Sequence, residues 1–189
     1  MTNAPPLPDD GEIRAIASRL DRPLVLIGMM GVGKSTIGRK LGHLLDLPFV
    51  DADEAIEAAA QMTVAEVFER FGEAHFRDGE RRVIARMLDD GPCIIATGGG
   101  AFMQEETRRL ILEKGVAVWL DSDVATLVER VGRKDTRPLL RNGDPHEILS
   151  RLKRERDGAY ALAPLRVTSK TGPHTETINQ ILKALDQWL

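Results

Sequence analysis

A glycine-rich segment with one lysine and two adjacent hydroxyls lies near the start of the chain. Residues 28–36 read GMMGVGKST and fit the pattern G-x-x-x-x-G-K-[ST], directly after the apolar run 23–27. The glycines allow a tight turn that points backbone N–H groups inward, and a following helix adds the positive end of its dipole. We therefore predict a loop that holds the phosphates of a nucleoside triphosphate. Lys34 would reach the β- and γ-phosphates, and the Ser35 hydroxyl would be a ligand of Mg²⁺.

The alternative for this segment is a chance glycine-rich turn, because the pattern also recurs by accident. Here an apolar strand candidate precedes the loop and an amphipathic helix candidate follows it. That order of elements is what a phosphate-binding loop needs, and it favours the phosphate site.

Two carboxylates close the second strand candidate. Asp51 and Asp53 fall in the segment PFVDAD, and alternate residues of a strand share a face. Ligands of open α/β sheets bind at the carboxyl ends of the strands, so the two acids are expected there. They could position water around Mg²⁺ and accept a proton from an attacking hydroxyl. The alternative is that either acid only caps the helix that follows.

Two further motifs could face a small anionic substrate. The run TGGGA (97–101) ends the third strand candidate, where three glycines make sense if a ligand lies against the backbone. The run FRDGE places Arg77 and Glu80 three residues apart on one helix face, an arrangement that presents a guanidinium to an anion. The alternatives are a mobile turn for the glycines and an ordinary surface ion pair for the arginine.

The basic segment 130–147 is interrupted by glycine and proline and has few apolar anchors. This composition is typical of a lid that closes over phosphates, with Arg137 as the charge that stabilises the transferring group. Arg156, on the next helix candidate, could be a second anion contact. The alternatives are a solvated loop and a solvated helix arginine.

The elements that must position these residues alternate between strands and helices from residue 23 onward, which predicts a parallel sheet with right-handed crossovers. The strand candidates are 23–29, 48–53, 93–98, 116–121 and 165–169. The helix candidates are 34–46, 63–72, 73–90, 104–113, 123–131, 146–160 and 175–188. Thr63 with Glu66 forms a predicted capping box at the start of the second of these helices.

Size and composition favour one domain, at 23–189, after an extension at 1–22 made of a tail and a short helix over 11–20. The chain has 189 residues, 42% apolar and 29% charged, and a net charge of −3, which gives no reason to expect nucleic acid or a membrane surface as a partner. No run approaches the ~20 apolar residues of a membrane span.

The single cysteine excludes an intrachain disulfide, and the start of the chain lacks the pattern of a signal peptide, so a cytoplasmic protein is expected. The four histidines lack metal-ligand spacing and are expected to be surface or core residues.

Taken together, the motifs GMMGVGKST, DAD, FGEAHFRDGE, TGGGA and TRPLL, in that order, resemble those of the shikimate kinase family. The resemblance covers about residues 23–188. It implies a three-layer P-loop kinase fold, with a five-stranded parallel sheet flanked by helices, a small helical substrate-binding region at about 51–80 and a lid at about 132–147. It implies Mg²⁺-dependent transfer of the ATP γ-phosphate to the 3-hydroxyl of shikimate, in the chorismate branch of aromatic amino acid biosynthesis, by an enzyme that we expect to be a monomer.

The resemblance also implies roles for individual residues. The catalytic residues would be Lys34, Asp53 and Arg137. ATP would be bound by Gly31, Val32, Gly33, Lys34, Ser35, Thr36, Arg130 and Arg137. Shikimate would be bound by Asp53, Arg77, Gly98, Gly99, Gly100 and Arg156. Mg²⁺ would be held by Ser35 and, through water, by Asp51.

The chain departs from the family pattern at two places. Gly158 stands where the family often has proline, two residues after Arg156, so the helix geometry there is open. The segment TSKTGPHTET, expected to contact adenine, leaves the choice among Lys170, Thr171 and Pro173 open. The rival hypotheses are another small-molecule P-loop kinase, such as gluconate kinase, and a GTP-dependent switch. The switch should carry N-K-x-D after the fourth strand, where this chain has DSDVATL.

Overall fold

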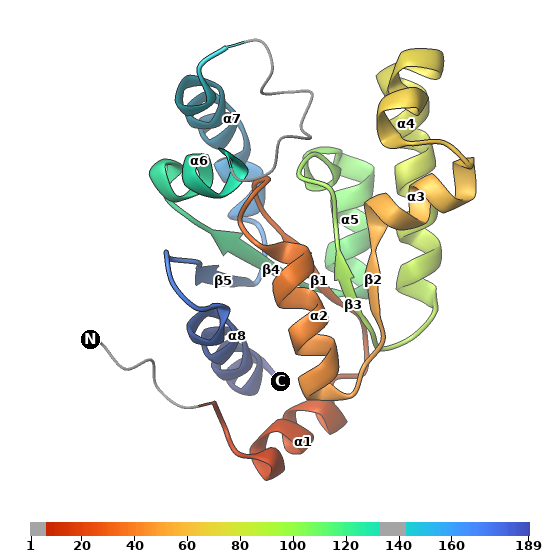
Figure 1. Cartoon of the computed structure of the whole chain (residues 1–189). Coiled ribbons are helices and arrows are strands. Elements are labelled where there is room, and N and C mark those ends of the chain that lie inside the picture. Colours follow the sequence, from red (N-terminus) through yellow and green to blue (C-terminus); the bar gives the residue numbers. More distant parts are fainter. Residues whose placement is uncertain (1–6, 133–142) are drawn as a thin grey trace.

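A computed structural model describes residues 7–132 and 143–189 as one α/β domain built on a five-stranded sheet (Figure 1). The strand order is β2-β3-β1-β4-β5, and every pairing is parallel. The strands are β1 (Leu24–Ile27), β2 (Phe49–Asp51), β3 (Ile94–Ala96), β4 (Val116–Asp121) and β5 (Leu165–Thr168). Each lies within its predicted range, so the predicted fold class and all five strands are confirmed.

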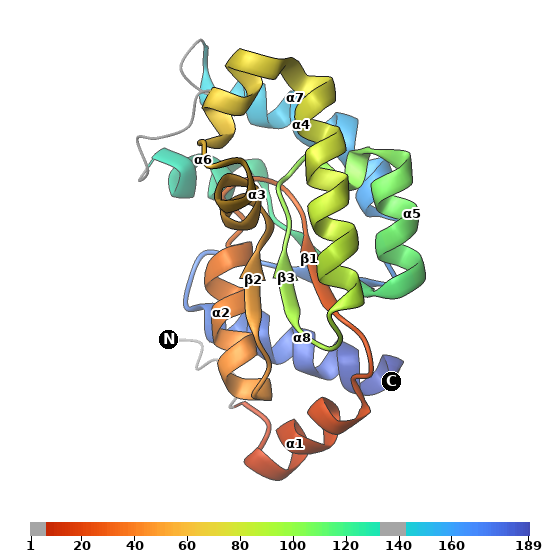
Figure 2. The same ribbon diagram turned by 90° about the vertical axis from the view of Figure 1, so that its right-hand side faces the viewer.

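Helices cover both faces of this sheet. The described helices are α1 (Asp10–Arg19), α2 (Lys34–Leu45), α3 (Ala52–Ala60), α4 (Val64–Asp89), α5 (Glu105–Lys114), α6 (Val124–Gly132), α7 (Pro145–Tyr160) and α8 (His174–Trp188), with a short 3₁₀ helix η1 (Ala101–Met103). One face carries α2 and α8, with α1 across their far ends, and the other carries α4 and α5 side by side (Figures 1 and 2). Among the described residues, no helix has the length and apolar character needed to cross a membrane.

The central strands are covered on both sides, and their sequences reflect this. All four residues of β1 are buried, as are the first five of β4, whereas β5 at the sheet edge alternates buried and exposed residues. Strands buried on both faces are selected for continuous apolar runs, which is why LVLI and VAVWL are recognisable in the sequence. The resulting core places the carboxyl ends of the strands at one edge of the sheet, where the loops that carry the predicted site residues meet.

The helices α3 and α4 have a small hydrophobic cluster of their own, centred on Ile56, Val67 and Phe76. The capping box predicted for Thr63 and Glu66 is present at the start of α4. The two helices predicted for this region, 63–72 and 73–90, meet at a kink within α4, where Gly72 lies outside helical geometry at φ 80°. Glycine tolerates this conformation without a Cβ clash, so the chain changes direction here and the first turns of α4 pack on α3.

The segment before the sheet is packed onto the domain. Asp9 caps α1 in a reciprocal arrangement with Glu12. Ile13, Ile16 and Leu20 belong to the same hydrophobic cluster as the sheet. The described part of the extension therefore contributes to the main core.

The contact between α2 and β2 generates a stability prediction. A Cβ on Gly38 would lie 2.9 Å from Phe49 Cδ2, whereas a Cβ on Gly79, in α4, meets nothing within 4 Å. We expect Gly38→Ala to lower the free energy of unfolding by about 1–2 kcal/mol, because overpacking outweighs the gain in helix propensity. Gly79→Ala, the matched control, should raise it by about 0.5–1 kcal/mol. Denaturant unfolding measures both, and a Gly38→Ala protein as stable as the wild type would contradict the packing at this contact.

Candidate active site

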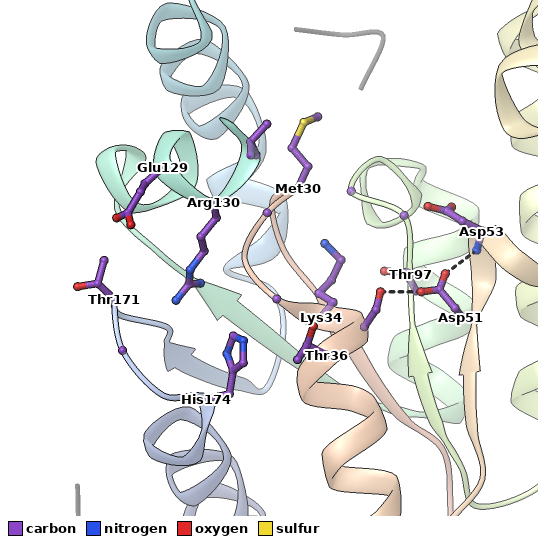
Figure 3. Close-up of a pocket in the computed structure, with 17 residues that line it drawn as sticks. Met30, Lys34, Thr36, Asp51, Asp53, Thr97, Glu129, Arg130, Thr171 and His174 are labelled. Carbon is purple, nitrogen blue, oxygen red and sulfur yellow. Dashed lines mark hydrogen bonds between the residues drawn. The ribbon is translucent and has the colours of Figure 1, made fainter. Parts of the chain in front are cut away.

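The carboxyl edge of the sheet holds a cleft of about 450 Å³ (Figure 3). Five segments line it: the loop after β1 with the start of α2, the end of β2 with the start of α3, the loop after β3, the end of α6 and the loop before α8. Parallel strands all end at this edge, so segments far apart in the sequence meet here.

The predicted phosphate loop forms one wall of this cleft. Gly33 precedes α2 with φ 105° and has no side chain to cap the helix, so the first turn of α2 can offer its N–H groups to an anion. The Lys34 ammonium donates to the carbonyl oxygens of Gly28 at 2.8 Å and Met29 at 2.9 Å. The loop therefore combines backbone donors, a helix N-terminus and one cation in the arrangement that binds phosphates.

The two predicted carboxylates line the opposite side, but not through the alternation that we expected. The strand ends at Asp51, and Asp53 lies in the first turn of α3, so the prediction that both share a strand face is wrong. The reason is that Asp51 caps α3: its carboxylate accepts the Asp53 N–H at 3.1 Å. The other carboxylate oxygen of Asp51 accepts the Ser35 hydroxyl at 2.6 Å. Asp51 thus both caps a helix and faces the phosphate loop (Figure 3).

The three glycines after β3 each lie against a different predicted substrate residue. A Cβ on Gly98 would lie 2.9 Å from an Asp53 carboxylate oxygen, and one on Gly99 would lie 3.0 Å from Arg156 Nη1. A Cβ on Gly100 would lie 2.8 Å from Arg77 Nη1. Glycine is needed here for close approach by charged side chains, because none of the three has a positive φ. The structure brings Asp53, Arg77 and Arg156 together around this short turn.

Arg77 and Glu80 form a largely buried ion pair, so the alternative of an ordinary surface pair does not hold. The two side chains are 2.7 Å apart and only 20% and 1% exposed. Glu80 Oε1 is buried with no hydrogen-bond partner among the described residues, next to the position that a Cβ on Gly98 would take. Burial raises the pKa of the Glu80 carboxyl, Arg77 opposes the shift, and the nearby Asp53 and Glu73 reinforce it. Sequence reasoning placed Glu80 beside Arg77 but gave no sign of this burial.

Arg156 keeps its place despite the departure from the family pattern at Gly158. The helix α7 continues through Gly158 to Tyr160, and Arg156 Nη1 donates to the Gly99 carbonyl at 3.2 Å. Glycine at this position therefore leaves the helix intact.

The remaining wall comes from α6 and the loop before α8. Arg130 donates to the carbonyls of Val32, at 3.0 Å, and Lys170, at 2.5 Å, and so ties α6 to both loops. Thr171, one of the three adenine candidates that the sequence left open, also lines the cleft. Glu129, Gly172 and His174 line it too and were not predicted. The only pointer to Gly172 and His174 was their position after a strand at the carboxyl edge.

His174 corrects the expectation that the histidines are surface or core residues. It lines the cleft opposite Arg130, and a Cβ on Gly33 would lie 3.3 Å from its Cε1 (Figure 3). Its Nδ1 is buried with no hydrogen-bond partner among the described residues. Burial lowers the pKa of His174, and Arg130 and Lys40 lower it further. The imidazole is therefore neutral at physiological pH and can stack or form hydrogen bonds in the cleft.

Arg137 and most of the predicted lid fall at 133–142, outside the described residues. The described flanks are the end of α6 and the start of α7, where Asp144 caps the helix.

A phosphate loop that faces guanidinium groups across a turn of three glycines defines a P-loop kinase of small molecules. Comparison with known proteins gives the particular family. A model of the shikimate kinase family matches residues 30–186. A shikimate kinase of Novosphingobium aromaticivorans is 62% identical over 182 residues, covering 94% of each chain. The chain belongs to the shikimate kinase family, whose members are ATP-dependent kinases.

Solved structures agree with this assignment. The shikimate kinase of Acinetobacter baumannii in complex with shikimate has a TM-score of 0.83 and 31% identity, with 93% of this chain and 96% of that chain covered. A gluconokinase of Sinorhizobium meliloti has a TM-score of 0.63 and 16% identity, over 90% of this chain and 94% of that chain, and shares the fold alone. The findings favour the shikimate kinase hypothesis over gluconate kinase.

The buried carboxyl of Glu80 generates a prediction for the pH dependence of stability. Its pKa is raised in the folded chain, so its contribution to stability is fully present below the ordinary value of 4.5 and is lost as the pH rises through the folded pKa. We expect the Tm of the wild type minus that of Glu80→Gln to be largest at pH 4 and to fall towards pH 8. Thermal unfolding of both proteins across this range measures the difference. A constant difference, or one that grows with pH, would contradict the burial of this charge.

Proposed function

We propose that this cleft holds ATP with Mg²⁺ beside shikimate and transfers the γ-phosphate to the shikimate 3-hydroxyl. The observation that carries the proposal is the glycine turn after β3. Its residues lie against Asp53, Arg77 and Arg156, while a Cβ on Gly99 would lie only 3.7 Å from Gly28 O and Met30 N of the phosphate loop. An acceptor bound at the turn would therefore adjoin the phosphates, which is the main requirement of phosphoryl transfer.

On the acceptor side, Arg77 and Arg156 would hold the carboxylate of shikimate. Guanidinium groups suit this task because they remain charged and form two parallel hydrogen bonds to a carboxylate. Asp53 would accept hydrogen bonds from the ring hydroxyls and take the proton of the attacking hydroxyl. Gly98, Gly99 and Gly100 would allow the substrate to lie against the backbone.

On the nucleotide side, the N–H groups of residues 31–36 and the Lys34 ammonium would hold the phosphates. The ammonium is now satisfied by two loop carbonyls, so it is already in the cleft and needs only to exchange partners. Arg130, Thr171 and His174 would hold the base, because they line the end of the cleft beyond the phosphate loop. This choice narrows the adenine contacts that the sequence left open.

The donor set on this side fits Mg²⁺. The Ser35 hydroxyl and the Asp51 carboxylate are 2.6 Å apart beside the phosphate loop, and Mg²⁺ prefers oxygen ligands and retains several waters. Ser35 would be a direct ligand and Asp51 would act through water. When bound, the ion would neutralise charge on the phosphates.

Three parts of the proposal rest on the sequence, through its composition or through the family resemblance. Arg137 would supply a lid cation to the transferring group, and residues 132–147 would close over the phosphates. The enzyme would act as a cytoplasmic monomer, without nucleic acid or membrane partners. Its product would enter the chorismate branch of aromatic amino acid biosynthesis.

A coupled assay for ADP release tests the reaction. With ATP and Mg²⁺, we expect turnover with shikimate and none with gluconate or nucleoside monophosphates. Lys34→Ala should lower kcat by at least about a hundredfold, because a cation that stabilises transition-state charge is lost. Equal rates with gluconate would overturn the acceptor assignment, and near-normal turnover by Lys34→Ala would overturn the phosphate site.

The carboxylate site has its own test. Arg77→Ala should raise the KM for shikimate about a hundredfold while the KM for ATP stays near the wild-type value. The reason is that the variant removes the guanidinium that would pair with the substrate carboxylate in a partly desolvated site. Gly100→Ala should act in the same direction, because the new Cβ would displace the Arg77 guanidinium. Arg81→Ala is the matched control: Arg81 lies on the same helix but pairs with Asp78 and Glu106. Its variant should keep both KM values, and an unchanged KM for shikimate in Arg77→Ala would count against the carboxylate role.

A further inference from the structure

Tyr160 is the last residue of α7 and points its hydroxyl at the turn of three glycines. The side chain is only 1% exposed, and its ring packs near those of Phe102 and Trp119, with ring centroids 6.4 Å and 5.9 Å away. The hydroxyl donates to the Gly99 carbonyl at 2.6 Å. Burial of the side chain fixes the ring, so this hydrogen bond has little freedom to move.

The Gly99 carbonyl accepts a second hydrogen bond, from Arg156 Nη1 at 3.2 Å. Arg156 and Tyr160 are four residues apart and share one face of α7. A carbonyl oxygen has two lone pairs and can accept from both donors at once. The two donors differ in kind: the tyrosine is held by its buried ring, whereas the arginine reaches the carbonyl through a long, flexible side chain.

This difference matters when Arg156 binds an anion. A guanidinium that turns to form two hydrogen bonds with a carboxylate gives up or weakens its bond to Gly99. The Gly99 carbonyl is half-buried, and a half-buried carbonyl left without a donor is disfavoured. With Tyr160 present, the carbonyl keeps a short hydrogen bond and Arg156 can leave freely. Without the hydroxyl, Arg156 would be the only side chain among the described residues that donates to Gly99 O, and binding would strand that oxygen.

We propose that Tyr160 is a positioning residue for the acid substrate, whose hydroxyl holds the Gly99 carbonyl so that Arg156 can exchange that carbonyl for the substrate carboxylate. The inference rests on the proposed function, because it takes Arg156 to be a carboxylate ligand. It adds a residue outside the set that contacts substrate or nucleotide, and it assigns the end of α7 a role in acceptor binding.

Tyr160 acts here as a neutral hydrogen-bond donor and transfers no proton. Burial raises its pKa to about 12, and the neighbouring Arg156 opposes part of that shift. The hydroxyl therefore stays protonated across the physiological range. Gly99 also adjoins the phosphate loop. A fixed Gly99 carbonyl therefore also holds in place the backbone that separates the nucleotide side of the cleft from the acceptor side.

The test is Tyr160→Phe, which removes the hydroxyl and keeps the ring. We expect the KM for shikimate to rise about tenfold, the effect of losing one hydrogen bond, with the KM for ATP within about twofold of the wild type. Trp119→Phe is the control, because it disturbs the same ring stack without touching Gly99. It should lower Tm and leave both KM values unchanged.

A double-mutant cycle tests the route through Arg156. In an Arg156→Lys background, which has lost the guanidinium, Tyr160→Phe should change the KM for shikimate by less than about twofold. A tenfold rise that persists in that background would overturn the inference, and so would equal rises in both KM values of the single variant.

The outcomes separate the two proposals. If the wild type does not consume shikimate, the proposed function fails. If the wild type turns over shikimate but Tyr160→Phe lowers Tm alone, with both KM values unchanged, only the positioning role fails.

Discussion

Close approach of charged side chains to a backbone without Cβ atoms is the constraint on which the rest of the site depends. At Gly98, Gly99 and Gly100, a carboxylate and two guanidinium groups come within the space that a methyl group would need. These groups arrive from α3, α4 and α7, so all three helices must pass close to the carboxyl end of β3. The kink at Gly72, the cap at Asp51 and the unbroken course of α7 through Gly158 each set how the chain meets this point.

The cations of the cleft share a second property, which is that each is already held by an oxygen of the protein. Lys34 donates to two loop carbonyls, Arg77 to Glu80, and Arg156 to Gly99. A ligand must therefore displace an existing partner, so binding is an exchange of hydrogen bonds in which little new charge is desolvated. This exchange is favourable only where the protein oxygen that loses the cation has another hydrogen-bond donor or tolerates having none. The residues around these oxygens are therefore as important for binding as the cations.

Much of this arrangement could be predicted from the sequence, because it is encoded locally. The phosphate loop is a contiguous pattern, the buried strands are contiguous apolar runs, and the box at Thr63 and Glu66 is a four-residue motif. The pairing of Arg77 with Glu80 follows from helical spacing. For these features, neighbouring residues in the chain are also the residues in contact.

The features that sequence reasoning missed depend on the tertiary fold. Asp53 is the exception, because the cap by Asp51 is local and was an open alternative, between which and a longer strand the sequence did not decide. His174 faces the cleft only because the loop after β5 folds back against Gly33. The burial of Glu80 arises from packing around Gly98, more than ten residues away in the chain. Such contacts join segments whose separate patterns are compatible with several arrangements.

The position of α1 has a practical consequence for work with shortened forms of the chain. This helix lies across the ends of α2 and α8 that are farthest from the cleft, and Arg19 pairs with Asp186 of α8 (Figure 1). Those two helices begin at Lys34, within the phosphate loop, and at His174, which lies close to Gly33 of that loop. A shortened protein that starts at residue 22 would expose the apolar surface that Ile13, Ile16 and Leu20 now cover. This surface lies at the ends of α2 and α8 that are farthest from the cleft. Expression boundaries and affinity tags are therefore best placed ahead of Asp9, where the helix cap remains whole.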